Sequence, residues 1–312
     1  YFRSHPMKTA FVFSVGVLLL SCRTPDSQAE LWLAPDSTAL ASSDSLVRYG
    51  RELVAATARY LGPQGRVAQI TNGMNCQNCH LKAGTQPFGN NFGSVSSLYP
   101  RFRERSGGLE SIEKRVNDCL QRSLNGHPID SLSHEMRAFV AYFHWLGQQV
   151  PKGTRAAGSG LVPLAFLPRA ADTVRGKIHF LAKCSSCHQA DGRGTRHPAK
   201  AEFIYPPLWG DSSFTTAAGL YRLSNFARYV YANMPQGATY TAPQLTPEEA
   251  WDIAAYVLSK PRVQKTFTED WPVLATKPID HPFAPYADSF PQVQHKYGPF
   301  GPIEKYYQAQ PK

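Results

Sequence analysis

A chain of 312 residues is long enough to form two domains, each with its own hydrophobic core. Its hydrophobic content of 42% is that of a globular protein, and its 25 prolines predict long irregular segments beside the packed elements. The formal net charge of +10 favours anionic partners, but nucleic acid is a poor candidate because no lysine-rich run or recognisable binding module accompanies the charge.

The N-terminal segment has the pattern of an export signal. After Met7, the expected initiator, the chain is apolar from 10 to 20 and then reads Ser-Cys up to Cys22. The apolar run is about half the ~20 residues that a membrane-spanning helix needs, which indicates a signal segment rather than a permanent anchor. Leu-Leu-Ser-Cys resembles the lipobox of bacterial lipoproteins, so we expect 1–22 to be a lipoprotein-type signal segment lipidated at Cys22. An ordinary signal peptide is the alternative, and both predict export to the periplasm, where the lipid would anchor the protein to a membrane.

Two similar sets of helix patterns follow along the chain. "VRYGRELVAATARYL" and "VRGKIHFLAK" place apolar residues at helical spacing, with Asp44 and Asp172 as candidate N-caps. Downstream, "MRAFVAYFHWL" (136–146) is echoed by "AWDIAAYVL" (250–258). The second of these closing helices opens with Thr-Pro-Glu-Glu (246–249), which predicts a capping box with a first-turn proline.

Each set encloses a C-x-x-C-H motif, Cys76-Gln77-Asn78-Cys79-His80 and Cys184-Ser185-Ser186-Cys187-His188. Two thiols at this spacing can attack the two vinyl groups of one haem, and the adjacent histidine can then bind the iron as its proximal ligand. A single C-x-x-C would also fit a redox pair or half a zinc site, but neither requires a histidine after both copies. The repeat predicts two covalently bound haem c groups, ligated by His80 and His188.

The predicted fold is mainly α, with two tandem cytochrome c domains and a C-terminal strap rich in proline and aromatic residues. We place the first domain at 44–149, a Gly- and Pro-rich linker at 150–171, the second domain at 172–260 and the tail at 261–312. The tail shows no helical or strand period, yet its apolar content argues against disorder. We therefore expect an extended strap packed over the domains.

The sixth iron ligand is simplest to assign in the second domain. Met234 lies 46 residues after His188, in the loop "YANMPQG" before the closing helix, where class I cytochromes c carry their methionine ligand. A methionine in the core is the alternative. The sequence "PPLWG" (206–210) resembles the loop whose proline carbonyl orients the proximal histidine in such domains.

The first domain offers five candidates for the sixth ligand: Cys119, His127, His134, Met136 and His144. Cys119 lies 39 residues after His80, so it occupies the interval of the repeat in which the second domain has its methionine. A thiolate is an anionic ligand and would lower the haem potential far below that of a methionine-ligated haem. A small buried thiol is the alternative reading of this position.

The sequence around this cysteine resembles the signature of the dihaem thiosulfate dehydrogenases, also called tetrathionate synthases. The matching residues are Arg115, Asn117, Cys119, Arg122, Ser123, Asn125 and Gly126. The resemblance extends from about 46 to 260 and includes "NCQNCHL", "YPRFRERSG" and "YANMP". It implies that Cys119 ligates the first haem and is the catalytic group, and that Arg105, Arg115 and Ser123 line the substrate pocket.

The reaction implied by the resemblance joins two thiosulfates to tetrathionate, or runs in reverse. Electrons would pass from the first haem to the second, and then to a small c-type cytochrome or another periplasmic acceptor. Arginine suits such a dianion because its planar guanidinium offers paired donors. Helical spacing places Arg115, Cys119 and Ser123 on one face, whereas Arg101, Arg103 and Arg122 fit either a solvated surface or the pocket.

Two further expectations concern the second haem and the function as a whole. Some family members have a lysine beside the methionine of the second haem, but this chain has Asn233 there, which predicts plain His188/Met234 ligation. A non-catalytic dihaem electron-transfer cytochrome is the alternative function.

Overall fold

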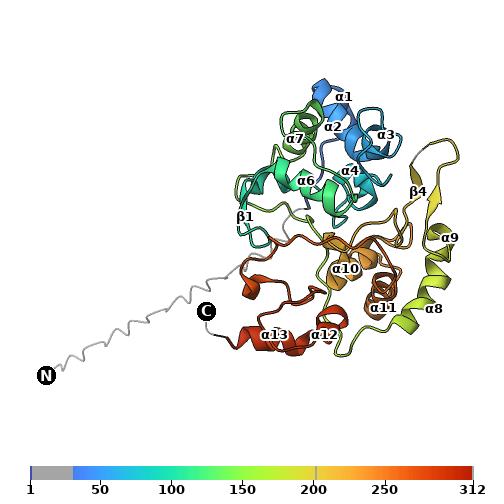
Figure 1. The fold of residues 1–312 in the computed structure, drawn as a ribbon. Coiled ribbons are helices and arrows are strands. Elements are labelled where there is room, and N and C mark those ends of the chain that lie inside the picture. Colours follow the sequence, from blue (N-terminus) through green and yellow to red (C-terminus); the bar gives the residue numbers. More distant parts are fainter. Residues whose placement is uncertain (2–30, 201, 311–312) are drawn as a thin grey trace. The chain divides into compact units, whose positions relative to one another are not determined.

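The structure is a computed structural model that describes Tyr1 and residues 31–200 and 202–310 (Figure 1). Residues Leu31–Lys312 make up one compact unit. The predicted signal segment and its Cys22 lie outside the described residues. Within the described part of the chain, no helix combines the length and the apolar composition needed to cross a membrane.

The two outer helices of the first domain cross at close range. α2 (Ser45–Ala55) begins after Asp44, whose side chain accepts a hydrogen bond from the first turn at 2.7 Å and so confirms the predicted N-cap. α2 packs against α7 (His134–Leu146). A Cβ on Gly50 would lie 2.0 Å from the carbonyl oxygen of Ala138, so only glycine allows the two backbones to approach this closely.

The second domain repeats this crossing with α8 (Thr173–Lys183) and α11 (Pro247–Leu258). Asp172 caps α8, and Thr246 and Glu249 form the predicted capping box of α11. A Cβ on Gly176 would lie 1.9 Å from the carbonyl oxygen of Asp252, which is the counterpart of the contact in the first domain. The predicted duplication is therefore confirmed at the level of backbone packing.

Between the outer helices, each domain has one further long helix and a two-stranded antiparallel hairpin. The helices are α6 (Ile112–Arg122) and α10 (Leu223–Asn233). The hairpins pair β1 (Arg101–Arg103) with β2 (Gly108–Glu110), and β3 (Thr195–Arg196) with β4 (Phe203–Tyr205). The short helices are α1 (Ser37–Ala41), α3 (Thr57–Leu61), α4 (Leu81–Gly84), α5 (Val95–Leu98), α9 (Ser185–His188) and the 3₁₀ turns η1 (Cys76–Asn78), η2 (Gly219–Tyr221) and η3 (Leu274–Thr276).

Each domain has its own core. In the first, Leu53, Phe139 and Tyr142 are almost fully buried. In the second, Phe180 and Trp251 are almost fully buried. Two cores of this kind are what a duplicated mainly α chain requires.

The expected C-terminal strap packs on the second domain, but it is only partly extended. It contains α12 (Gln292–Tyr297) and α13 (Gly301–Gln308), drawn in red in Figure 1. Phe300 and Ile303 belong to the core of the second domain. These helices are too short to show a clear apolar period, although the proline in the first turn of α13 was a usable start signal.

Candidate haem sites and the cysteine helix

The first C-x-x-C-H motif opens into a cavity of about 320 Å³ that is lined by Cys76, Cys79 and His80. His80 Nδ1 lies 2.6 Å from the carbonyl oxygen of Asn90. Because a carbonyl can only accept, Nδ1 carries the proton and Nε2 is left free to bind iron. Burial lowers the pKa of His80 to about 4, which keeps the imidazole neutral as a ligand must be.

Cys119 lines the same cavity from α6. That helix begins after Ser111, whose Oγ accepts a hydrogen bond from Lys114 N, and it presents Arg115, Cys119 and Ser123 to the cavity. The predicted common face of these three residues is thus confirmed. The electrostatic interaction with Cys119 is the main cause of the raised pKa of Arg115. A cation therefore lies beside the sulfur atom on the same helix face.

The other candidates for the sixth ligand in the first domain lie elsewhere in the described structure. Met136 is completely buried in the core. His127, His134 and His144 are exposed, and none of them lines either cavity. Of the five candidates, the structure brings only Cys119 to the wall of the cavity that contains His80.

Arginines surround the cavity more completely than the sequence indicated. Arg101 and Arg103 from β1 line it together with Arg115, and so does Arg155 from the linker. No short-range signal in the sequence connects Arg155 with the motif. Among the described residues of this cavity wall, none is acidic. The wall therefore has four cationic side chains to attract an anion.

Arg105 does not belong to the wall of this cavity. Its guanidinium lies 5.5 Å from the ring centroid of Trp271 in the tail. Burial, followed by the charges of Arg122 and Arg115, lowers its pKa to about 10. Its Nε atom is buried and has no hydrogen-bond partner among the described residues. Arg105 thus lies outside the described wall, and its charge interacts with that of Arg115.

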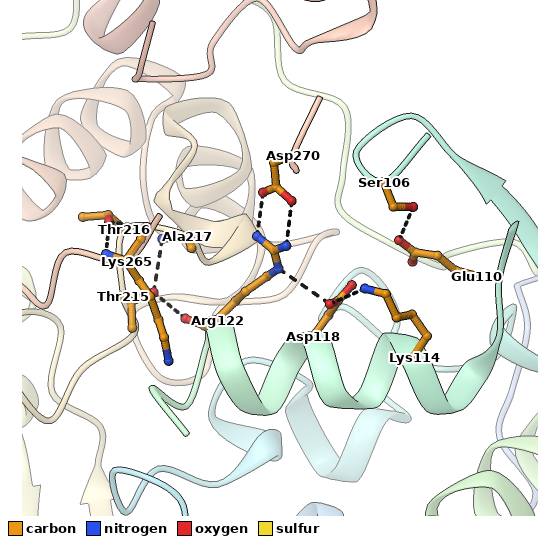
Figure 2. A network of polar contacts seen from close by, with 10 residues as sticks. All are labelled: Ser106, Glu110, Lys114, Asp118, Arg122, Thr215, Thr216, Ala217, Lys265 and Asp270. Carbon is orange, nitrogen blue, oxygen red and sulfur yellow. Dashed lines mark hydrogen bonds and ion pairs between the residues drawn. The ribbon is translucent and has the colours of Figure 1, made fainter. Parts of the chain in front are cut away.

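Arg122 matches neither of the two expectations for it, a solvated surface or the pocket. Its side chain is 5% exposed and forms a two-point ion pair with Asp270 of the tail, at 2.6 and 2.7 Å (Figure 2). The face of its guanidinium lies 3.7 Å from the ring centroid of Phe267. This arginine links α6 to the tail.

The second motif lines a larger cavity of about 720 Å³ with Cys184, Cys187, His188 and Met234. His188 Nδ1 lies 2.8 Å from the carbonyl oxygen of Pro206, so the predicted role of the "PPLWG" loop is confirmed. Burial lowers the pKa of His188. Met234 follows the last residue of α10 directly and contributes to the cavity wall.

The two cavities adjoin. Cys79 and Asn75 contribute to both walls. Tyr229 of α10 donates a hydrogen bond to the carbonyl oxygen of Asn78, inside the first haem motif, at 3.0 Å. The side chain of Asn233, beside Met234, also donates to the carbonyl oxygen of Phe88 in the first domain at 3.1 Å. A group bound in the second cavity would therefore lie next to the first attachment motif.

Both donor sets fit haem c. Each cavity holds two thiols for thioether bonds and a neutral histidine whose Nδ1 is already engaged by a carbonyl. The wall of the first cavity also contains the thiol of Cys119, and that of the second contains the thioether of Met234.

Comparison with known proteins agrees with this arrangement. The family model "Cytochrome c" matches residues 173–261, and "SoxA/TsdA, cytochrome c domain" matches residues 66–151. Two cytochrome c domains are thereby confirmed.

Several similar proteins are named thiosulfate dehydrogenase. The chain is 36% identical to a thiosulfate dehydrogenase from Allochromatium vinosum over 265 residues, which cover 82% of this chain and 93% of the relative. It is 36% identical to a thiosulfate dehydrogenase from Psychrobacter arcticus, over 65% of this chain and 61% of the relative. Among solved structures, thiosulfate dehydrogenase (TsdBA) from Marichromatium purpuratum matches with a TM-score of 0.69 and 28% identity, over 76% of this chain and half of that chain.

Proposed function

The chain belongs to the thiosulfate dehydrogenase family, and on that premise we propose that it joins two thiosulfates to tetrathionate, or catalyses the reverse reaction, as a dihaem cytochrome c. The observation that carries the proposal is the first cavity. Its described wall combines His80 and Cys119 with four arginines and no acidic side chain. This charge pattern suits a small dianion and has no evident use in a protein that only transfers electrons.

The two domains divide the work. The first, at 44–149, is the proposed reaction site, with His80 and Cys119 as the iron ligands. The second, at 172–260, is the proposed electron-transfer domain, with His188 and Met234 as the ligands. When bound at the two motifs, haem c would accept or donate one electron at each site.

Cys119 is the proposed nucleophile, and the reaction balances on its sulfur atom. The outer sulfur of one thiosulfate bonds to Cys119 Sγ and gives Cys–S–S–SO₃⁻, while two electrons leave for an external acceptor. The outer sulfur of a second thiosulfate then attacks the sulfur atom of the adduct that is bonded to Cys119 Sγ. The S–S bond to Cys119 breaks, tetrathionate leaves, and Cys119 returns as a thiolate. The sum is two thiosulfates giving one tetrathionate and two electrons.

The arginines of the cavity wall hold the two dianions close together against their mutual repulsion. Arg115 has the most direct role, because its charge interacts with the Cys119 thiolate. Ser123, one turn beyond Cys119, offers a hydroxyl for a sulfonate oxygen. Arg105 raises the positive potential from behind the wall.

The electron acceptor is proposed to be a small c-type cytochrome or another periplasmic carrier. The export pattern of the sequence supports a periplasmic location, and the lipobox-like Cys22 supports attachment to a membrane.

The decisive experiment uses the purified protein with both haems attached. Thiosulfate with an artificial acceptor should yield tetrathionate, and tetrathionate with a reduced dye should yield thiosulfate. Electron paramagnetic resonance should give two sets of g-values, one for thiolate/histidine and one for methionine/histidine. Activity in neither direction would leave the alternative, a non-catalytic electron-transfer cytochrome.

A further inference from the structure

The C-terminal end of α6 is held by groups from outside its own domain. The last four carbonyls of a helix have no partner within it. In α6, Cys119 O accepts from Ser123 N at 2.9 Å, and Leu120 O accepts from Gly126 N at 2.8 Å. The last two carbonyls depend on distant residues.

Those residues come from the second domain and the tail. The carbonyl of Gln121 accepts from Lys265 Nζ at 2.9 Å, and the carbonyl of Arg122 accepts from Thr215 Oγ1 at 2.7 Å. Lys265 Nζ also donates to Gly126 O at 3.3 Å. An ammonium group at a helix C-terminus interacts favourably with the helix dipole as well.

The side chain of Arg122 adds a second attachment at the same turn. Asp270 binds both of its terminal nitrogens, and Asp118 lies 3.8 Å from its Nε (Figure 2). Phe267 covers the face of its guanidinium. A two-point pair between planar groups fixes orientation as well as distance. A buried ion pair contributes little net stability compared with an apolar pair, so its value lies in geometry.

This attachment is one turn from Cys119. Arg122 is three residues beyond the cysteine, and the intervening backbone is a regular helix. We propose that Arg122, Lys265 and Asp270 are positioning residues that fix the turn of α6 bearing Cys119, and so fix the position of its sulfur relative to the iron bound by His80. The proposal rests on the proposed ligation by Cys119. It gives the tail a part in the reaction site, although residues 262–312 lie outside both family models.

The second domain offers a matched contact for comparison. Asp280 of the tail pairs with Arg222 and accepts a hydrogen bond from Ser224 N at 3.1 Å, at the start of α10. Met234 follows the opposite end of that helix, about 16 Å away for eleven helical residues. The tail thus holds α6 at its ligand end and α10 at the end far from the ligand.

The experiment compares Asp270→Asn with Asp280→Asn in the full chain with both haems attached. Asp270→Asn should replace part of the thiolate/histidine signal with a second low-spin or high-spin signal and leave the methionine/histidine signal unchanged. It should lower kcat by about 10–100-fold, as is usual for residues that support a metal ligand. The KM for thiosulfate should change little, because neither Arg122 nor Asp270 lines the cavity. Asp280→Asn should leave both signals unchanged.

A second variant keeps the proposal testable if Asp270→Asn fails to fold. Lys265→Met keeps the apolar stem but removes the ammonium that binds Gln121 O, and it should shift the thiolate/histidine signal in the same direction by a smaller amount. Unchanged signals in both Asp270→Asn and Lys265→Met would overturn the proposal, and so would an equal effect of Asp280→Asn on the first haem. If the unaltered protein shows no thiolate/histidine signal, then the ligation by Cys119 is wrong, which is a separate result.

Discussion

Met234 follows the last residue of α10, whereas Cys119 lies inside α6, a turn before that helix ends. The walls around them differ too, because the described residues of the first cavity include four arginines and those of the second include two lysines and no arginine. A methionine-ligated haem with a modestly charged wall suits electron transfer, and an anionic sulfur among arginines suits an anion that reacts. One duplicated framework thus supports two different sites, because the helix that supplies the proposed sixth ligand differs between the domains, as do its surroundings.

The strongest test of the comparison removes the sulfur of the first site. Cys119→Gly should retain both haems, because attachment depends on the C-x-x-C-H motifs, yet lower turnover by at least about 10³-fold, since the nucleophile is lost. Thiosulfate-dependent reduction of an artificial acceptor measures the effect, and the haem content per chain is the control. Substantial remaining turnover would show that Cys119 is not the reaction centre.

The arginine wall of the first site predicts the next largest effect. Arg115→Lys preserves the charge but loses the paired planar donors, so kcat/KM for thiosulfate should fall by about 10²-fold. Arg137→Lys, at an exposed position of α7, is the matched control and should behave as the unaltered protein. Equal kinetics for the two variants would mean that the arginines do not bind substrate.

The second site should respond separately from the first. Met234→Leu removes the thioether, so the methionine/histidine signal should disappear while the thiolate/histidine signal stays. Turnover with an external acceptor should fall by about 10–100-fold because the electron exit is impaired and the site of sulfur chemistry is intact. Loss of both signals would contradict the assignment of Met234 to the second haem alone.

Substitutions at the helix crossing that both domains share should have the smallest effects, and the loss of stability should be equal in the two domains. Gly50→Ala and Gly176→Ala each force a Cβ onto the carbonyl of the crossing helix, and each should cost about 1–3 kcal/mol in the free energy of unfolding. Gly219→Ala is the control, because a Cβ there meets no atom within 4 Å. Denaturant unfolding measures all three. A clear difference between Gly50→Ala and Gly176→Ala would show that the two crossings are not equivalent.

The sequence alone determined the features that depend on neighbouring residues. The C-x-x-C-H motifs, the N-caps Asp44 and Asp172, and the capping box at 246–249 all work over a few residues, so their patterns are visible in a single chain. The alignment of Cys119 with Met234 followed from counting along the repeat. The two helices of the tail escaped prediction because they are short and are separated by glycine and proline.

Only the tertiary structure decided which arginines line the proposed reaction site. Arg115 and Arg122 lie on the same helix, yet one lines the cavity and the other pairs with Asp270, 148 residues further along the chain. Arg155 reaches the cavity from the linker, and Arg105 lies behind the wall against Trp271. A local pattern cannot separate these cases, because an arginine is placed by whichever charged or aromatic group the fold brings to it, and that group can come from any distance along the chain.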